Sequence, residues 1–334
     1  MTGGCRRGSI GLYTLLLLSL LAPLSAEAQR KAQPPPRVGV LLTGSPGRNP
    51  ELHVFRQALQ GLGYVEGTSI ILEMRWVEAR VERQAVLVSE LVRLPVDVLV
   101  VGTTSAAMDA AQVTTATPIV TATAGALVEA GVVAGLARPG GNVTGLTSMQ
   151  ADLAAKRLEL LKEAVPRLSR VTALRPLYSR ASLGEIFAAQ TDAAARSLGI
   201  QLQLRQVAVP SDLEDAFQAA AGHRADAIIF LPSPFFSVHG ARIAELALKH
   251  HVPTMANEEQ MVWAGSLMAY SVDYLDMWRR AAGYVDRILR GATPAELPVE
   301  QPRKFRLVIN LKTARTLGLT IPQSLLLRAD EVIQ

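Results

Sequence analysis

Small hydroxyl side chains cluster at three points in the first half of this 334-residue chain, each directly after a short apolar run. They are Thr43 and Ser45, then Thr103, Thr104 and Ser105, and finally Thr123. Because Thr103–Ser105 open a stretch of helical spacing, their hydroxyl and backbone N–H groups could bind a carboxylate or a similar anion. The alternative is that they only cap the helix. We predict that all six contact a ligand.

A second group, richer in aromatic side chains, follows the apolar runs of the second half. It comprises Tyr178, Ser179, Ser233, Phe235, Asn257 and Tyr270. Aromatic rings at such positions can wall an apolar or ring-bearing ligand, although each ring could instead pack within its own loop. We predict that this group covers the ligand whose polar end the first group holds.

Residue patterns typical of catalytic sites are absent from the sequence. There is no G-x-S-x-G elbow, no G-x-G-x-x-G after Leu42 or Val101, and no G-x-x-x-x-G-K-[ST] loop. The five histidines form no H-E-x-x-H pair, and the single cysteine excludes a multi-thiolate metal site. Glu258 and Glu259 are sequence neighbours that seldom share a face, so we expect a capping or surface role. We predict no catalytic residue, metal or cofactor.

The composition is that of a globular chain without a nucleic-acid partner. Hydrophobic residues make up 49% and charged residues 19%, which excludes global disorder, and the length suggests about two domains. The net charge of +5 is small and scattered along the chain. A nucleic-acid-binding protein normally has a basic stripe with a reading motif, and neither is present.

The first 28 residues have the pattern of a secretory signal peptide. Arg6-Arg7 forms a basic start, Ile10–Leu21 is an apolar run, and Ala26-Glu27-Ala28 supplies small residues at alternate positions. The apolar run is shorter than the ~20 residues that span a membrane. We predict cleavage before Gln29 and delivery to the periplasm, by the general or the twin-arginine export route.

From Arg37 onward, after a proline-rich linker at 29–36, short apolar runs alternate with stretches of helical spacing. In the first half, strands are predicted at 37–42, 70–74, 96–101 and 118–122, and helices at 52–62, 81–94, 104–115 and 127–137. In the second half, helices are predicted at 156–165, 183–198, 213–221 and 243–250, and strands at 170–174, 201–207, 225–230 and 252–255. Alternation of strands and helices indicates α/β architecture, here two doubly wound parallel-sheet lobes.

The C-terminal stretch adds predicted strands at 266–270 and 305–309 and helices at 277–289 and 312–317. In a two-lobe scheme we expect Asn142–Thr147 and Ser266–Ser271 to cross between the lobes. Lobe one then holds residues 37–143 and about 272–334, lobe two holds residues 144–271, and a hinge joins them.

Four long segments resemble one protein family. They are GLGYVEGTSIILEMRW (61–76), LARPGGNVTGLT (136–147), KRLELLKEAVP (156–166) and LPVEQPRKFRLVINLKTARTLGLTIPQSLLLRADEVI (297–333). From about Arg37 to Gln334 the chain resembles the tryptophan/tyrosine-type substrate-binding proteins of ABC transporters, which have the periplasmic-binding-protein type I fold. The resemblance implies a two-lobe receptor that closes on a small solute and delivers it to a permease and an ATPase in the inner membrane.

The chain departs from the family pattern at Gly125-Ala126, Arg175-Pro176 and Ala256–Glu258, where relatives often have Asp-Pro, Asn-Pro and small polar residues. These positions are expected on the cleft side, so the aromatic amino acids bound by better-studied relatives are not carried over to this chain. Two other functions stay open: a sensory module that presents its ligand to a membrane receptor, and an exported enzyme on the same fold.

Overall fold

The computed structural model describes Met1 and residues 34–334, except residues 48, 79, 151, 178 and 179. Apart from Met1, the predicted signal peptide lies outside the described residues, as do residues 29–33 of the predicted linker. Within the described part of the chain, no helix combines the length and the apolar character needed to cross a membrane. The folded unit begins at Arg37 with strand β1 (Arg37–Leu42).

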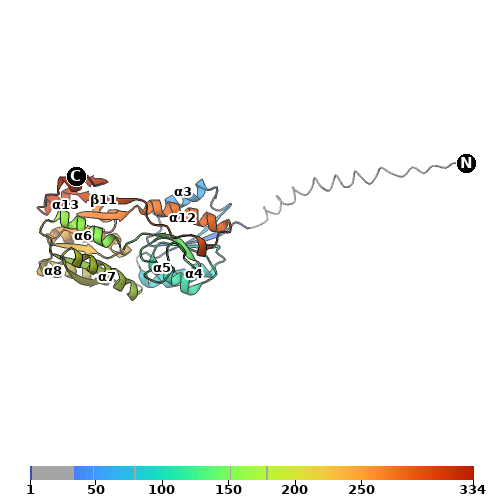
Figure 1. The fold of residues 1–334 in the computed structure, drawn as a ribbon, viewed down its shortest axis with the longest axis horizontal. Helices are drawn as coiled ribbons and strands as arrows, with labels where there is room; N and C mark the ends of the chain where they lie inside the picture. Colours follow the sequence, from blue (N-terminus) through green and yellow to red (C-terminus); the bar gives the residue numbers. More distant parts are fainter. Residues whose placement is uncertain (2–33, 48, 79, 151, 178–179) are drawn as a thin grey trace. The chain divides into compact units, whose positions relative to one another are not determined.

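The first of two sheets has five parallel strands, and we call this sheet with its helices lobe one. Its strands lie in the order β2 (Ile71–Trp76), β1, β3 (Val98–Val101), β4 (Ile119–Ala124) and β5 (Val143–Thr147). The apolar run of β3 is buried throughout because helices cover both faces of the sheet. One face carries α3 (Pro50–Gly61) and α12 (Tyr274–Leu289); the other carries α4 (Gln84–Arg93), preceded by η1 (Val81–Arg83), and α5 (Thr104–Val113) (Figure 1).

The second sheet has seven strands, and we call it with its helices lobe two. Its strands lie in the order β12 (Glu331–Ile333), β11 (Phe305–Asn310), β10 (Met268–Val272), β9 (Thr254–Ala256), β8 (Ala227–Phe230), β6 (Arg170–Pro176) and β7 (Gln201–Val207). All neighbours are parallel except β10 and β11, which are antiparallel. The prediction of two doubly wound, mostly parallel lobes is confirmed.

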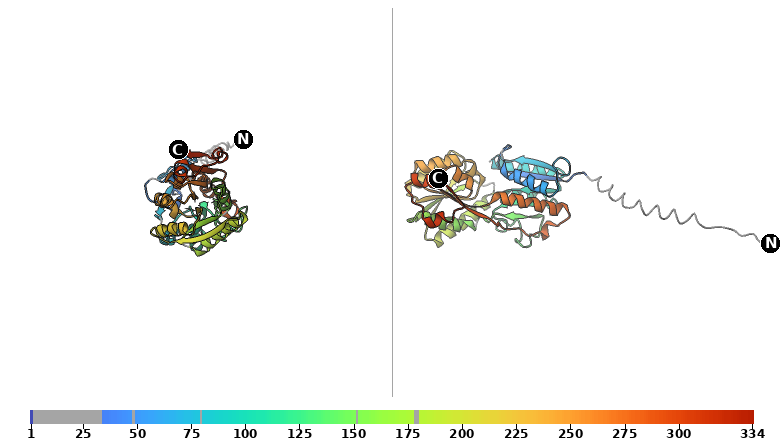
Figure 2. Two further views of the ribbon diagram at one scale, coloured as in Figure 1. Left: turned by 90° about the vertical axis from the view of Figure 1, so that its left-hand side faces the viewer. Right: turned by 90° about the horizontal axis from the view of Figure 1, so that it is seen from above.

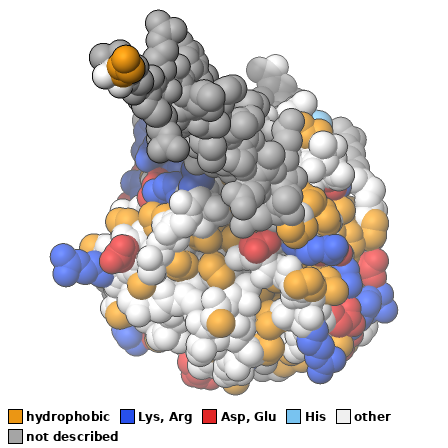
Figure 3. Space-filling view, turned by 90° about the vertical axis from the view of Figure 1, so that its right-hand side faces the viewer, with side chains coloured by type: hydrophobic (Ala, Val, Ile, Leu, Met, Phe, Trp, Pro, Cys, Tyr) orange, Lys and Arg blue, Asp and Glu red, His pale blue; other side chains and the backbone are white. Residues whose placement is uncertain are grey.

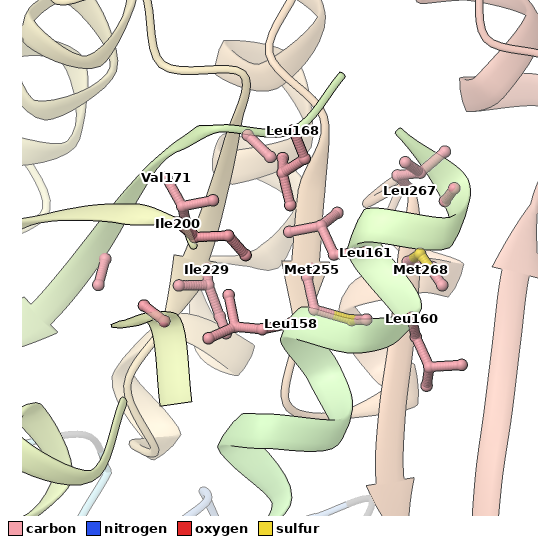
Figure 4. Close-up of a cluster of buried hydrophobic side chains, with 14 of the residues drawn as sticks. Leu158, Leu160, Leu161, Leu168, Val171, Ile200, Ile229, Met255, Leu267 and Met268 are labelled. Carbon is pink, nitrogen blue, oxygen red and sulfur yellow. The ribbon is translucent and has the colours of Figure 1, made fainter. Parts of the chain in front are cut away.

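Helices cover both faces of the second sheet as well. One face carries α6 (Leu153–Ala164), α7 (Ala181–Ser197), α13 (Leu311–Thr316) and α14 (Gln323–Leu326). The other carries α8 (Asp212–Gly222), α9 (Pro234–Val238), α10 (Gly240–Lys249) and α11 (Glu259–Trp263). Figure 4 shows Leu158 and Leu161 of α6 packed toward Ile229 and Met255 of the sheet. Spacings of three and four residues place such leucines on one helix face, which explains why this segment forms an amphipathic helix.

The chain passes between the two lobes in three places. It crosses after β5 to α6, returns after β10 to α12, and crosses again between η2 (Pro294–Glu296) and β11. Figure 2 shows the orange helix α12 against the lobe that holds the blue strands, in agreement with its packing on α3. Glu300, just before the last crossing, forms a bridge to Leu146 of β5.

The expected division of the chain differs from the strand pairing at the C-terminus. The sequence prediction assigned about 272–334 to lobe one. In the structure, β11 and β12 extend the second sheet, because β11 pairs with β10 along its length. Leu307 and Val308 of β11 are buried on opposite faces, which requires a sheet covered on both sides. The predicted crossings at Asn142–Thr147 and Ser266–Ser271 also form strands, β5 and β10, and the chain crosses only after them.

The helix predicted at 127–137 is wrong. The described backbone there forms turns, with Gly131 at φ +67° and the Ala134 N–H bonded to the Pro139 carbonyl. A left-handed residue and two adjacent β-branched valines oppose a helix, and the apolar spacing instead brings Leu127 and Val133 into the core of lobe one.

Candidate functional site

A cavity of about 370 Å³ lies between the lobes, and both contribute to its lining. From lobe one come residues that follow β1, β3 and β4 and residues at the starts of α3, α5 and α12. From lobe two come residues that follow β8 and β9, together with part of α7 and α9. The carboxyl ends of parallel strands in both sheets thus face one space, the usual position of a ligand in open α/β sheets.

Eight of the twelve predicted ligand residues line this cavity. They are Thr43, Thr103, Thr104, Ser105, Thr123, Ser233, Phe235 and Asn257. Tyr178 and Ser179 lie outside the described residues. Ser45 and Tyr270 are not among the lining residues: Ser45 is exposed in the loop after β1, and the Tyr270 ring stacks on Phe305 with centroids 6.0 Å apart. For all twelve residues, direct contact with a ligand stays a prediction.

The start of α5 presents its positive end to the cavity. Thr103 is the N-cap, and its Oγ1 accepts a hydrogen bond from the Ala106 N–H at 3.2 Å. The Thr104 Oγ1 accepts bonds from the N–H groups of Gly125, at 2.9 Å, and Ala126, at 3.2 Å, which join α5 to the segment after β4. The capping role considered from the sequence is therefore present at Thr103. The helix dipole still favours a negative group near this turn.

A chain of polar contacts leads from this turn to the opposite lobe. The Ser105 hydroxyl donates to the Gln84 amide oxygen at 3.2 Å, and the Gln84 amide nitrogen donates to Asp109 Oδ2 at 2.7 Å. Asp109 Oδ1 in turn accepts from Arg180 Nη2 at 2.6 Å. Asp109 belongs to α5 in lobe one, whereas Arg180 is the N-cap of α7 in lobe two, so this ion pair connects the lobes directly.

Asn257 is a buried lining residue whose side-chain amide has no hydrogen-bond partner among the described residues. Its side chain is only 4% exposed, and neither the amide oxygen nor the amide nitrogen has a hydrogen-bond partner. A buried, unpaired polar group costs about 1–3 kcal/mol, so a ligand group that pairs with this amide recovers that cost. Its place directly after β9 puts it at the carboxyl edge of the second sheet.

Glu258 was expected to be a cap or surface residue, but its side chain lines the cavity. It occupies the N-cap position of α11 without making a capping bond, and its Oε2 accepts from the Ser237 hydroxyl at 2.5 Å. The pKa of Glu258 is raised to about 7, mainly by burial; the hydrogen bond from Ser237 and the charge of Arg157 act against this rise, and the charge of Glu51 adds to it. The sequence placed the segment Ala256–Glu258 on the cleft side, but it did not indicate that the Glu258 carboxylate itself joins the lining.

Arg157, on α6, is 1% exposed and connects two of the lobe crossings. Its Nε donates to the Tyr270 carbonyl at 2.8 Å and its Nη2 to Gln150 Oε1 at 2.7 Å. The Gln150 amide nitrogen donates to the Tyr274 hydroxyl at 2.6 Å. Burial lowers the pKa of Arg157 to about 10 and raises the pKa of Tyr274. Its Nε and Nη2 groups thus bond to segments that lead into the crossings, while its charge lowers the pKa of Glu258.

Aromatic and acidic side chains that the sequence did not single out complete the lining. Phe187, Tyr274 and Trp278 add to the wall formed by Phe235, and Glu51 faces the cavity from the first turn of α3. No described set of three or more His, Cys, Asp or Glu residues is placed to hold a metal ion. The lining is suited to a small molecule with an apolar body and polar ends.

A family model described as "ABC transporter substrate binding protein" matches residues 38–333. The chain belongs to this family. The resemblance read from the four sequence segments is confirmed, and this substrate-binding protein is not an enzyme, since the family is defined by binding. Two of the three departures from the family pattern, Gly125 and Asn257-Glu258, lie at the cavity, whereas Arg175 contacts Glu185 and Gln206 instead.

Relatives of known structure agree with this assignment. A conserved domain protein from Vibrio cholerae O1 biovar El Tor superposes with a TM-score of 0.80 at 26% identity, covering 90% of this chain and 100% of the other. A Streptococcus pneumoniae ABC domain in complex with L-Trp gives a TM-score of 0.79 at 25% identity, with the same coverage. In sequence, the substrate-binding protein is 24% identical to a tyrosine-binding protein of Clostridioides difficile strain R20291, over 79% of this chain and 75% of that one.

Proposed function

We propose that this substrate-binding protein is the solute receptor of an ABC importer and that it captures a small amino-acid-like ligand between its lobes. It acts in the periplasm after removal of the signal peptide near Ala28, and it delivers the ligand to a permease and an ATPase in the inner membrane. The S. pneumoniae relative holds L-Trp and the C. difficile relative is named for tyrosine, which supports an amino acid as the ligand class.

The observation that carries this proposal is the unpaired Asn257 amide in a cavity to which both lobes contribute. An amide offers a donor to a ligand carboxylate and an acceptor to a ligand amine, so one side chain can recognise both ends of an amino acid. The start of α5 offers further N–H groups to a carboxylate. Phe187, Phe235 and Trp278 suit the apolar side chain.

The proposed mechanism is hinge closure about the three crossings. Contacts that the ligand makes with both lobes exist together only when the lobes are close, so the ligand favours the closed form through its higher affinity for it. Changing an open to closed ratio from 1:99 to 99:1 requires about 5.5 kcal/mol of such preference. No bond of the ligand is made or broken.

Calorimetric titration of the purified mature chain with the twenty amino acids and small carboxylates tests the proposal. We expect saturable binding of at least one amino acid at one site per chain, and recovery of that amino acid unchanged. Conversion of the ligand to a product, or an absence of binding across the whole panel, contradicts the proposal.

A further inference from the structure

The charged groups that line the cavity are acidic, and they come from opposite lobes. Among the described lining residues, Glu51 of lobe one and Glu258 of lobe two carry carboxylates, and none is Lys, Arg or His. Glu51 makes no hydrogen bond or ion pair with any described residue. Glu258 accepts one hydrogen bond, from Ser237, and forms no ion pair with the part of the chain that is described.

Two carboxylates that line one cavity are unfavourable unless a cation lies between them. Carboxylates lose solvation when they are buried, and like charges repel more strongly at low effective dielectric. The charge of Arg157 lowers the pKa of Glu258, but Arg157 does not line the cavity and forms no ion pair with Glu258 or Glu51 in the described part of the chain. The cavity therefore presents acceptor groups whose natural complement is a positively charged ligand group.

Asn257 supplies an independent sign of a ligand at the same place. Its amide oxygen is an unpaired acceptor next to Glu258 in the sequence, and the side chain is buried in the cavity lining. An ammonium group has three donors and no acceptor. The Glu51 carboxylate, the Glu258 carboxylate and the Asn257 amide oxygen provide three matching acceptors.

We infer that the cavity selects ligands by their amine, which binds as an ammonium between Glu51, Glu258 and Asn257, and that the ligand carboxylate is dispensable. This inference rests on the proposed function and narrows its ligand class to primary amines, with or without a carboxylate. Binding of the ammonium would also provide a physical cause for the proposed closure of the two lobes. Since the two carboxylates come from different lobes, an ammonium between them replaces repulsion by attraction when the lobes approach.

Matched trios of small molecules test the inference by calorimetry. Three trios are used, one each for tryptophan, tyrosine and leucine. Each trio contains the L-amino acid, the amine that lacks its carboxylate, and the carboxylic acid in which hydrogen replaces its amine. We expect the amine of a bound amino acid to keep its affinity within about tenfold, and the deaminated acid to lose about 100-fold, because charge-assisted hydrogen bonds are lost.

Charge-neutral variants provide the second arm. We expect Glu51→Gln and Glu258→Gln each to weaken amine binding about 10- to 100-fold. Glu129→Gln is the matched control, because Glu129 is exposed and does not line the cavity. The melting temperature without ligand verifies that each variant is folded.

The outcomes separate this inference from the proposed function. If amino acids bind but their amines do not, or if Glu51→Gln and Glu258→Gln behave like Glu129→Gln, the amine selection is overturned and the solute receptor stands. If no member of any trio and no other amino acid binds, both are overturned.

Discussion

At the level of single residues, two buried asparagines differ in their hydrogen bonding. Asn310 is 6% exposed and fully engaged: it accepts from the Thr313 N–H at 3.0 Å and donates to the Val262 carbonyl at 3.2 Å. Asn257 is as deeply buried and has no partner. The hydrogen bonds of Asn310 therefore stabilise the fold, whereas the described residues offer the Asn257 amide no such bond.

Replacement of each by leucine should have opposite effects on stability. We expect Asn257→Leu to raise the free energy of unfolding of the ligand-free protein by about 1 kcal/mol while ligand binding falls at least tenfold. Asn310→Leu, the control, should lower the same free energy by about 1–3 kcal/mol and leave the cavity intact. Urea titrations and calorimetry measure both quantities. A destabilised Asn257→Leu protein would show that this amide supports the fold.

Glu258 gives the ligand-free protein a pH dependence of known sign. Its folded-state pKa of about 7 lies above the ordinary value of 4.5, mainly through burial. The unfolded chain therefore releases this proton at lower pH than the folded chain does, so stability falls as pH rises from about 4.5 to 7 and levels off above. The groups that face Glu258 are Ser237 of α9, Glu51 of α3, Arg157 of α6 and Tyr274 of α12.

We expect Glu258→Gln to remove this contribution. Urea unfolding at pH 5 and pH 8, without ligand, should show a smaller loss of stability across that interval for the variant than for the parent protein. Equal losses in the two proteins would mean that Glu258 ionises normally.

At the level of elements, one glycine of the segment 136–147 allows strands β4 and β5 to pack closely. Gly145, in strand β5, has φ +120°, and a Cβ added there would lie 2.2 Å from the Thr121 carbonyl oxygen of β4. Only glycine combines this backbone conformation with so close an approach of the two strands. The Thr121 hydroxyl also donates to the carbonyl of Leu146, which fixes the pair.

We expect Gly145→Ala to destabilise the protein by about 1–3 kcal/mol or to prevent its folding, since a side chain would force both strain and a clash. Gly135→Ala is the control, because a Cβ at Gly135 meets no atom within 4 Å. Thermal unfolding compares the two. A Gly145→Ala protein as stable as the Gly135→Ala protein would refute this explanation of the strand contact.

Prediction from the sequence succeeded where the signal is local. Buried strands such as Val98–Val101 are continuous apolar runs, and residues after them, such as Thr103, line the cavity as their position suggested. It failed where distant pairing decides. The antiparallel contact of β11 with β10 moved residues 305–333 to the second sheet. The segment Ala256–Glu258 was expected on the cleft side, but the direction of the Glu258 side chain depends on tertiary packing.

At the scale of the whole folded unit, the Asp109–Arg180 ion pair couples the lobes. It joins α5 to α7, and through Gln84 and Ser105 it connects to residues that line the cavity. A charged hydrogen bond that exists only when the lobes are close contributes about 1.5–3 kcal/mol to that arrangement. The arrangement of the lobes in this structure is thus favoured by contacts within the protein itself.

We expect Arg180→Ala to shift the ligand-free protein toward open forms and to weaken ligand binding about tenfold or more. Small-angle X-ray scattering should show a larger radius of gyration than for the parent. Arg175→Ala is the matched control, because the Arg175 side chain contacts Glu185 and Gln206 within its own lobe. Identical scattering and binding for the two variants would rule out a role of the ion pair in closure.

Capture of a ligand between the lobes is best tested by a crystal structure of the mature chain with the tightest ligand from the titration panel. We expect the ligand, chemically unchanged, between the lobes, with Asn257 within hydrogen-bond distance of it and its polar groups near Glu258 and the start of α5. A ligand bound outside this cavity, or one that leaves the Asn257 amide unpaired, would show that this cavity is not the ligand site.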